Sequence, residues 1–173
     1  PRERVPFHCT CCGECCRHVR QSVPLESPDV FRLTRLLREK GVAYENNPNL
    51  DIREYIHDMP DCLAAADLVI ARAGAITLAE LTAVGRASVL IPSPNVAENH
   101  QYHNAMVLAN HKAAVVIEEK DLTGEKLVAA VKEMTADPEK LREIGLAAKA
   151  LGVPNACGHI TDELLDLYKT HRK

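Results

Sequence analysis

Two short stretches of this chain carry groups that could hold a phosphorylated ligand. In the first, residues 71–80, small residues surround Gly74 at the point where a predicted strand ends and a helix begins. The free N–H groups and the dipole of a helix N-terminus favour a phosphate there. Glu80 lies about one turn into that helix, where its carboxylate could accept paired hydrogen bonds from ribose hydroxyls. A second explanation stays open, because small residues at such a turn also permit close packing within the protein.

The second stretch, residues 91–105, again reads as a strand, a loop and the start of a helix. His100, Gln101 and Asn104 present hydrogen-bonding groups on the first turn of this helix, and such groups suit sugar hydroxyls. An alternative is a metal site built on His100 and His103. That site would need a third ligand from a distant part of the chain, because none is nearby in sequence.

A third stretch could bind a metal ion, because five of the seven cysteines fall between Cys9 and Cys16. A disulfide framework cross-links distant segments, which cysteines packed into eight residues cannot do. Thiolates spaced C-x2-C-x2-C-C can surround one soft metal ion. We therefore predict zinc or iron at Cys9, Cys12, Cys15 and Cys16. The two remaining cysteines, Cys62 and Cys157, are predicted to be small buried residues.

The elements that would position the first two stretches alternate between strands and helices. Predicted strands cover residues 52–56, 67–71, 87–92 and 113–118. Predicted helices cover residues 59–65, 77–84, 100–110, 125–136 and 139–151, and a last one starts at about residue 158. Continuous apolar runs such as residues 68–70 and 89–91 suit parallel strands that are covered on both faces. The pattern predicts an α/β fold with a partial doubly wound parallel sheet, in which ligands bind beyond the carboxyl ends of the strands.

The composition changes near residue 46. Residues 1–46 contain the cysteine cluster, a polar stretch and one helix, which follows Ser27 and stops at Gly41. We predict a small cysteine-rich helical segment over residues 1–46 and a second domain over residues 47–173.

The formal net charge is -3 without a basic block, so a nucleic-acid partner is not expected. A run of 18 apolar residues is also missing, so no membrane span is predicted.

About 120 residues of the second domain resemble the MurG family, whose members transfer N-acetylglucosamine (GlcNAc) and form lipid II. Several motifs occur in order at the family's spacing: Tyr55-Ile56-His57-Asp58-Met59-Pro60, Arg72-Ala73-Gly74-Ala75-Ile76-Thr77 and His100-Gln101-Tyr102-His103-Asn104-Ala105. The resemblance implies the C-terminal, Rossmann-like half of a GT-B glycosyltransferase. It also implies transfer without a cofactor, with helix N–H groups in place of a metal.

The resemblance further implies a role for each matching residue. Ile56 would contact uracil, and Glu80 would hold the ribose. The diphosphate would lie along the turn formed by Gly74, Ala75, Ile76 and Thr77. Gln101, with His100 and Asn104 nearby, would read the GlcNAc sugar. No catalytic residue is expected here, because the family's base belongs to an N-terminal domain that these residues do not include. The family's Gly-Gly-Ser phosphate loop is not included either.

The partners implied are UDP-GlcNAc as donor and, in the complete enzyme, lipid I (undecaprenyl-pyrophosphoryl-MurNAc-pentapeptide) as acceptor. The complete enzyme would lie in the cytoplasm, peripherally on the cytoplasmic face of the inner membrane. This chain alone is expected to transfer no sugar.

Residues 1–46 resemble the start of bacterial cysteine-cluster proteins that chelate zinc or iron, with the pattern F-x-C-x-x-C-G-x-C-C. Cys9, Cys12, Cys15 and Cys16 match this pattern, and Cys11 is additional. Two alternatives to the glycosyltransferase interpretation follow. The chain could be a metal-binding protein, or a non-functional chimera of the two families.

Overall fold

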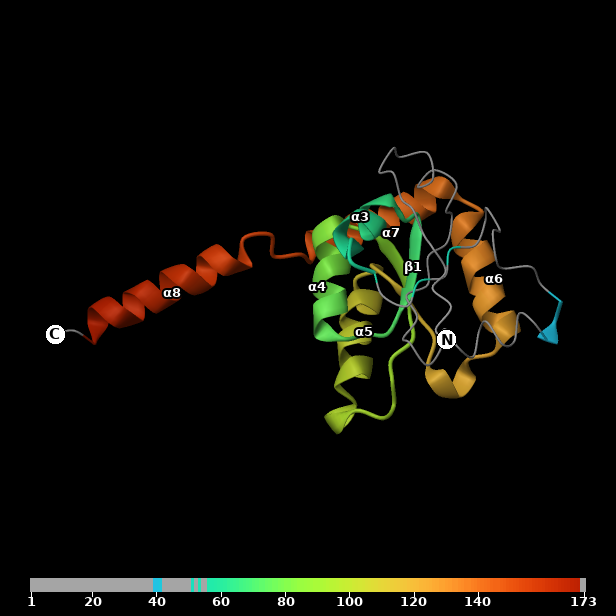
Figure 1. Ribbon diagram of the computed structural model, residues 1–173, viewed down its shortest axis with the longest axis horizontal. Coiled ribbons are helices and arrows are strands. Elements are labelled where there is room, and N and C mark those ends of the chain that lie inside the picture. Colours follow the sequence, from blue (N-terminus) through green and yellow to red (C-terminus); the bar gives the residue numbers. More distant parts are fainter. Residues whose placement is uncertain (1–38, 42–50, 52, 54–55, 172–173) are drawn as a thin grey trace, which may run out of the picture.

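The structure of this chain is a computed structural model that describes residues 39–41, 51, 53 and 56–171. Its elements form a parallel sheet between layers of helices (Figure 1). In chain order they are α3 (Met59–Ala65), β1 (Leu68–Ala71), α4 (Ala75–Val84), β2 (Ala87–Leu90), η1 (Ala97–Asn99), α5 (His100–Asn110), β3 (Val115–Val116), η2 (Glu119–Asp121), α6 (Gly124–Thr135), α7 (Pro138–Ala150) and α8 (Ala156–Thr170), where η marks a 3-10 turn.

The sheet has the strand order β1-β2-β3, and both strand pairs are parallel. Leu68 pairs with Ala87 and Ala71 with Leu90, so β1 and β2 end at the same edge. Every residue of β1 and β2 is buried, as strands covered on both faces require. The predicted α/β fold with a parallel sheet is therefore confirmed.

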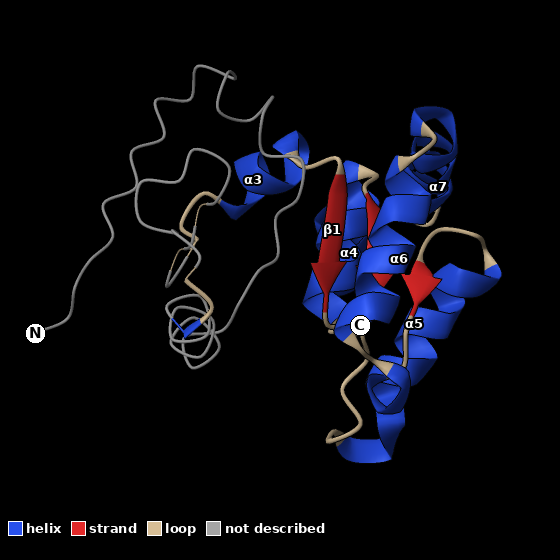
Figure 2. Cartoon of the chain, turned by 90° about the vertical axis from the view of Figure 1, so that its right-hand side faces the viewer, coloured by secondary structure: helices blue, strands red, loops and turns tan. Residues whose placement is uncertain are grey.

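Figure 2 shows the strands of the sheet packed among helices. Each face of the sheet carries its own apolar cluster. On one face Val69, Ala71 and Leu90 pack with residues of α3, α4 and α5, namely Leu63, Leu78, Leu81, Ala105 and Leu108. The other face presents residues such as Leu68, Ile70 and Val89 to α6, which contributes Val131 and Met134. Helix α7 contributes to both clusters, since Ala148 joins the first and Leu141 and Ile144 pack against the second.

Side-chain caps begin helices α6 and α7. The Thr123 hydroxyl accepts a hydrogen bond from the N–H of Lys126 at 3.1 Å, which satisfies one of the free donors of α6. Asp137 accepts from the N–H groups of Glu139 at 3.0 Å and Lys140 at 3.3 Å. Pro138 then occupies the first position of α7, where the missing N–H costs nothing.

Strand β3 is shorter than the predicted strand over residues 113–118, because both ends of that segment are used by neighbouring turns. The N–H of Ala113 bonds to the carbonyl of Leu108 at 2.8 Å and closes the end of α5. After Ile117, whose N–H bonds to Leu90 at 3.0 Å, the chain turns into η2.

Two predicted features near the start of the described residues have different outcomes. Of the predicted strand over residues 52–56, Arg53 and Ile56 are described, and both lie outside any strand. Arg53 instead binds the carboxylates of Asp51 and Asp58, each at 2.9 Å, which holds the segment beside α3. The predicted helix stop is confirmed at Gly41, which follows a helical Glu39 and has a φ of 66°.

Helix α8 extends away from the sheet and its covering helices in Figure 1. Its apolar side chains are exposed: the exposed fraction is 61% for Ile160, 61% for Leu164 and 54% for Leu167. Cys157 lies in this helix and is exposed, so its predicted burial is wrong, whereas Cys62 is half-buried. None of the described helices is long and apolar enough to cross a membrane.

The predicted metal ligands Cys9, Cys12, Cys15 and Cys16 lie outside the described residues, as does the predicted boundary near residue 46. Both stay predictions. Within residues 39–41, 51, 53 and 56–171, no three His, Cys, Asp or Glu side chains gather in a way that could hold a metal ion.

Candidate functional site

The two stretches singled out in the sequence meet at one edge of the sheet. Since Ala71 pairs with Leu90, the chain leaves β1 and β2 at the same level, and both continue into loops at the carboxyl edge. The side-chain amide of Asn104 in α5 donates to the carbonyl oxygen of Ala73 at 3.4 Å. This contact brings the first turns of α5 beside the turn at Gly74, where ligands of such folds bind.

The N-terminus of α4 offers free backbone donors at this edge. Gly74 is the N-cap residue in an extended conformation, and it has no side chain to cap the helix. The first helical hydrogen bond runs from the N–H of Leu78 to the carbonyl of Gly74 at 3.0 Å. The three N–H groups before it have no carbonyl of a preceding helical turn to bind. Together with the helix dipole, they form a site suited to a phosphate.

Close packing within the protein does not explain Gly74. A β-carbon added there would meet only the hydroxyl oxygen of Thr77, at an ordinary contact distance of 3.8 Å. Its φ of -68° is open to any residue. Ala75 and Ile76 are exposed, Ile76 to 77%. The small residues of this turn therefore face solvent and do not pack against other parts of the protein. This favours a ligand-binding role of the turn over a role in close packing.

Glu80 lies on the same face of α4 as this turn. It follows Ile76 by four residues and Thr77 by three, the spacings at which helical side chains are neighbours. It is half-buried. Among the described residues, its carboxylate has no hydrogen-bond or ion-pair partner. The group is thus free to accept hydrogen bonds from a ligand.

The predicted sugar-reading residues of α5 have defined local partners. The side-chain oxygen of Gln101 accepts a hydrogen bond from the backbone N–H of Ser93 at 2.9 Å. This fixes the orientation of the amide and leaves its NH₂ group as the donor for a ligand. His100 is exposed, and its Nδ1 lies 2.9 Å from the carbonyl oxygen of Ala97.

The loop before α5 has an unusual backbone. Glu98 and Asn99 both have positive φ angles, 52° and 51°, a region that residues other than glycine seldom adopt. Such conformations tend to occur at functional sites, where the surrounding structure holds them in place.

The remaining predicted contact, Ile56, is half-buried just before α3, and α3 packs against α4.

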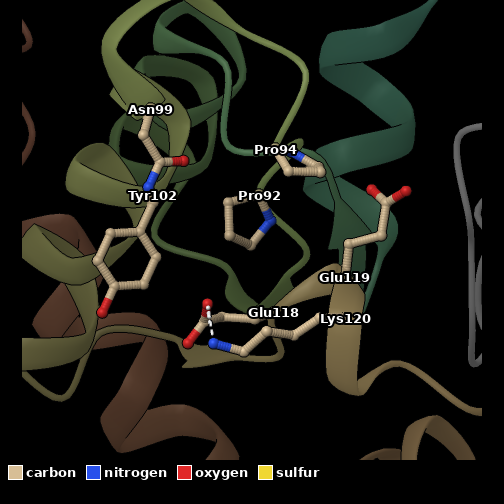
Figure 3. A pocket seen from close by; sticks show the side chains of 7 residues that line it. All are labelled: Pro92, Pro94, Asn99, Tyr102, Glu118, Glu119 and Lys120. Atoms are coloured by element: carbon tan, nitrogen blue, oxygen red, sulfur yellow. Dashed lines mark ion pairs between the residues drawn. The ribbon is translucent and has the colours of Figure 1, made fainter.

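A pocket of about 310 Å³ lies at the same edge, beyond β2 and β3 (Figure 3). It is lined by Pro92, Pro94, Asn99, Tyr102, Glu118, Glu119 and Lys120. None of the predicted ligand residues is among them. The ammonium group of Lys120 binds Glu118 at 3.0 Å, and this hydrogen bond and charge raise the pKa of Lys120.

Sequence reasoning missed these residues and the role of Arg72, although a signal was present. Glu118 ends the predicted strand over residues 113–118, and Glu119 and Lys120 follow directly after it. In a parallel sheet they must therefore reach the same edge as the other loops. Arg72 follows directly after β1 at this edge, and its guanidinium forms an ion pair with Glu119.

Comparison with known proteins identifies the family. The model of the glycosyltransferase family 28 C-terminal domain matches residues 34–159. This chain belongs to that family. The transferase of Desulforamulus reducens named UDP-N-acetylglucosamine--N-acetylmuramyl-(pentapeptide) pyrophosphoryl-undecaprenol N-acetylglucosamine transferase is 48% identical over 124 residues, which are 72% of this chain and 33% of the relative. The Bacillus subtilis protein of the same name is 44% identical over 133 residues, 77% of this chain and 36% of that protein.

Among solved structures, that of MurG from Acinetobacter baumannii matches this family 28 domain with a TM-score of 0.69 and 28% identity. The match covers 84% of this chain and 41% of MurG. The predicted GT-B resemblance is thus confirmed for the fold. This chain spans only about a third to two fifths of the length of these relatives.

Proposed function

We propose that this chain binds UDP-GlcNAc as the donor-binding part of a glycosyltransferase that transfers GlcNAc to lipid I and forms lipid II. The observation that carries the proposal is the open turn at Gly74, which protein packing does not require, with the free carboxylate of Glu80 one turn further along α4. The names of the relatives, which are 44–48% identical in their matching segments, support the choice of substrates.

Each part of the donor then has a place. The diphosphate binds the first N–H groups of α4, and the carboxylate of Glu80 accepts hydrogen bonds from the ribose. The NH₂ group of Gln101 donates to an oxygen of the sugar, because its carbonyl oxygen is held by Ser93. Ile56 contacts the uracil, as the family resemblance implies.

This arrangement also defines what the chain contributes to the reaction. An acceptor hydroxyl attacks the anomeric carbon of GlcNAc, the bond from that carbon to the diphosphate breaks, and UDP leaves with an additional negative charge. Fixed N–H groups at the N-terminus of α4 stabilise this charge as it develops, without reorganising. We assign no base for the acceptor hydroxyl within this chain. Because the acceptor is lipid-linked, the complete enzyme would work at the cytoplasmic face of the membrane.

Calorimetric titration with UDP-GlcNAc tests the proposal. Each charge-assisted hydrogen bond to a ribose hydroxyl contributes roughly 1.5–3 kcal/mol. Glu80→Ala is therefore expected to weaken binding at least about tenfold. Glu143→Ala is the matched control, because Glu143 is an exposed glutamate in α7, away from the site. Equal affinities of the unsubstituted chain and the Glu80 variant would contradict the ribose assignment.

A further inference from the structure

Three hydrogen bonds close a ring around the turn that follows β1. They join Arg72 with Ile91, Ser93 with Gln101, and Asn104 with Ala73. The first bond connects the end of β1 to the loop after β2. The second connects that loop to α5, and the third returns from α5 to the residue beside Arg72.

The donors and acceptors of the ring alternate between side chains and backbone. Nη1 of Arg72 donates to the carbonyl oxygen of Ile91 at 3.2 Å. Two residues later the backbone N–H of Ser93 donates to Gln101 at 2.9 Å. The position of Gln101 relative to the Gly74 turn therefore depends on where the Arg72 contact holds this loop.

Arg72 also reaches the third strand. The same nitrogen forms an ion pair with Glu119, which lies just after β3 in η2. Strand β3 pairs with β2 through two residues, and the buried Ile117 adds one backbone hydrogen bond to Leu90. One guanidinium thus ties together the carboxyl ends of β1, β2 and β3.

We propose that Arg72 is a positioning residue for the sugar of the donor. It keeps the loop after β2, and through Ser93 the amide of Gln101, at a fixed distance from the diphosphate turn of α4. This inference rests on the proposed donor site, and it adds to that site a residue that need not touch the ligand. The diphosphate contacts the first N–H groups of α4, and none of the three bonds joins a residue of α4 itself. Arg72 is therefore expected to affect mainly the affinity that the sugar adds.

If Arg72 had a purely structural role, replacing it would lower the melting temperature of the chain. The side chains of Arg72 and Glu119 are 50% and 37% exposed, and ion pairs with such exposure are screened and contribute little to global stability. Replacing Arg72 is therefore expected to leave the melting temperature nearly unchanged. The effect should appear locally, in the loop after β2 and in sugar recognition.

The test compares Arg72→Gln and Arg72→Lys with the unsubstituted chain and with Arg142→Gln, a control at an exposed arginine of α7. Lysine keeps the charge but lacks the planar, multiply donating guanidinium. Hydrogen exchange of the Ser93 amide, followed by NMR, reports on the ring without any ligand. Calorimetry with UDP and with UDP-GlcNAc then gives the affinity that the sugar adds.

In both Arg72 variants, exchange at Ser93 is expected to be at least about fivefold faster, since local opening becomes easier. The ratio of UDP-GlcNAc to UDP affinity should fall by about fivefold, the contribution of roughly one hydrogen bond. The Arg142 control should change neither quantity.

Unchanged exchange at Ser93, or an unchanged affinity ratio with intact UDP binding, would overturn the role of Arg72 and leave the donor site standing. Failure of the unsubstituted chain to bind UDP would instead contradict the proposed function, and the role of Arg72 in sugar binding would fall with it.

Discussion

At the scale of a single residue, Gly74 is the position at which two explanations of the turn, ligand binding and close packing, can be told apart. A β-carbon there has room, and the backbone angles suit any residue, so the glycine is not needed for folding. In the proposed donor site, the glycine lets the ligand approach the backbone of α4. The methyl group of an alanine at this position would fit the folded chain but would stand where the diphosphate is proposed to approach. A substitution here can therefore change binding without changing stability.

Gly74→Ala is accordingly expected to change the free energy of unfolding by no more than about 1 kcal/mol, since alanine restricts the unfolded chain but is a poorer N-cap than glycine. The affinity for UDP-GlcNAc should fall at least about fivefold, or roughly 1 kcal/mol. Urea unfolding and calorimetry measure the two quantities. Unimpaired binding by a stable Gly74→Ala protein would show that the ligand does not approach this turn.

The sequence was sufficient to place the Gly74 turn at a strand–helix junction, but not to predict the hydrogen bonds around that turn. Gly74 and Glu80 stand out because a strand–helix junction fixes where helix N–H groups point. The bonds of Gln101 to Ser93 and of Asn104 to Ala73 depend on the path of a loop with left-handed residues at Glu98 and Asn99. Neither residue type demands that conformation, so a pattern of residue types does not predict it.

At the scale of elements, α7 is held in place by a close approach of backbones. A β-carbon at Gly145 would lie 2.6 Å from the carbonyl oxygen of Gly85, in the turn between α4 and β2. Gly85 itself has a φ of 76°, so this turn cannot easily move to make room. The approach lets α7 pack against both α4 and β2, and so fixes the layer that supports the site from behind.

Gly145→Ala is therefore expected to lower the free energy of unfolding by about 1–3 kcal/mol, the usual cost of overpacking. Gly124→Ala is the control, because a β-carbon at Gly124 would meet no atom within 4 Å. Urea denaturation with a fluorescent or circular dichroism signal measures both. Equal midpoints for the two variants would mean that α7 does not lie as closely against the α4–β2 turn as described.

Elements with local signals were predicted well. Helices α3 and α5 have their predicted bounds, and α6 and α7 each begin and end one residue earlier than predicted. Helix α4 begins two residues earlier than predicted, because Gly74 rather than a polar side chain serves as N-cap. Strand β3 shortens because the turn after α5 and η2 compete for its residues, a competition set by tertiary contacts.

At the scale of the whole molecule, the described residues form one layered α/β unit of family 28, and the chain spans about a third to two fifths of the relatives' length. Transfer requires donor and acceptor to be held in line, and this orientation can supply about 7–11 kcal/mol of the barrier. A positioned base adds a further factor of roughly 10²–10⁴. The residues described here account for the donor alone.

We therefore expect the 173-residue chain by itself to bind the donor and to form no product. The assay is transfer of radiolabelled GlcNAc to a lipid I analogue, beside a full-length relative at equal concentration. Turnover within about a hundredfold of that relative, roughly 2.7 kcal/mol in barrier height, would contradict this expectation.

The central claim, that the donor binds at the Gly74 turn, is tested most directly by mapping where the ligand binds. The measurement is a ¹H–¹⁵N NMR titration of the chain with UDP-GlcNAc. The largest shifts are expected at the amides of Gly74, Ala75, Ile76 and Thr77, with smaller ones near Gln101, and none on α6. Shifts gathered instead around Tyr102 and Lys120 in the neighbouring pocket, or no shifts at the N-terminus of α4, would contradict the proposed donor site.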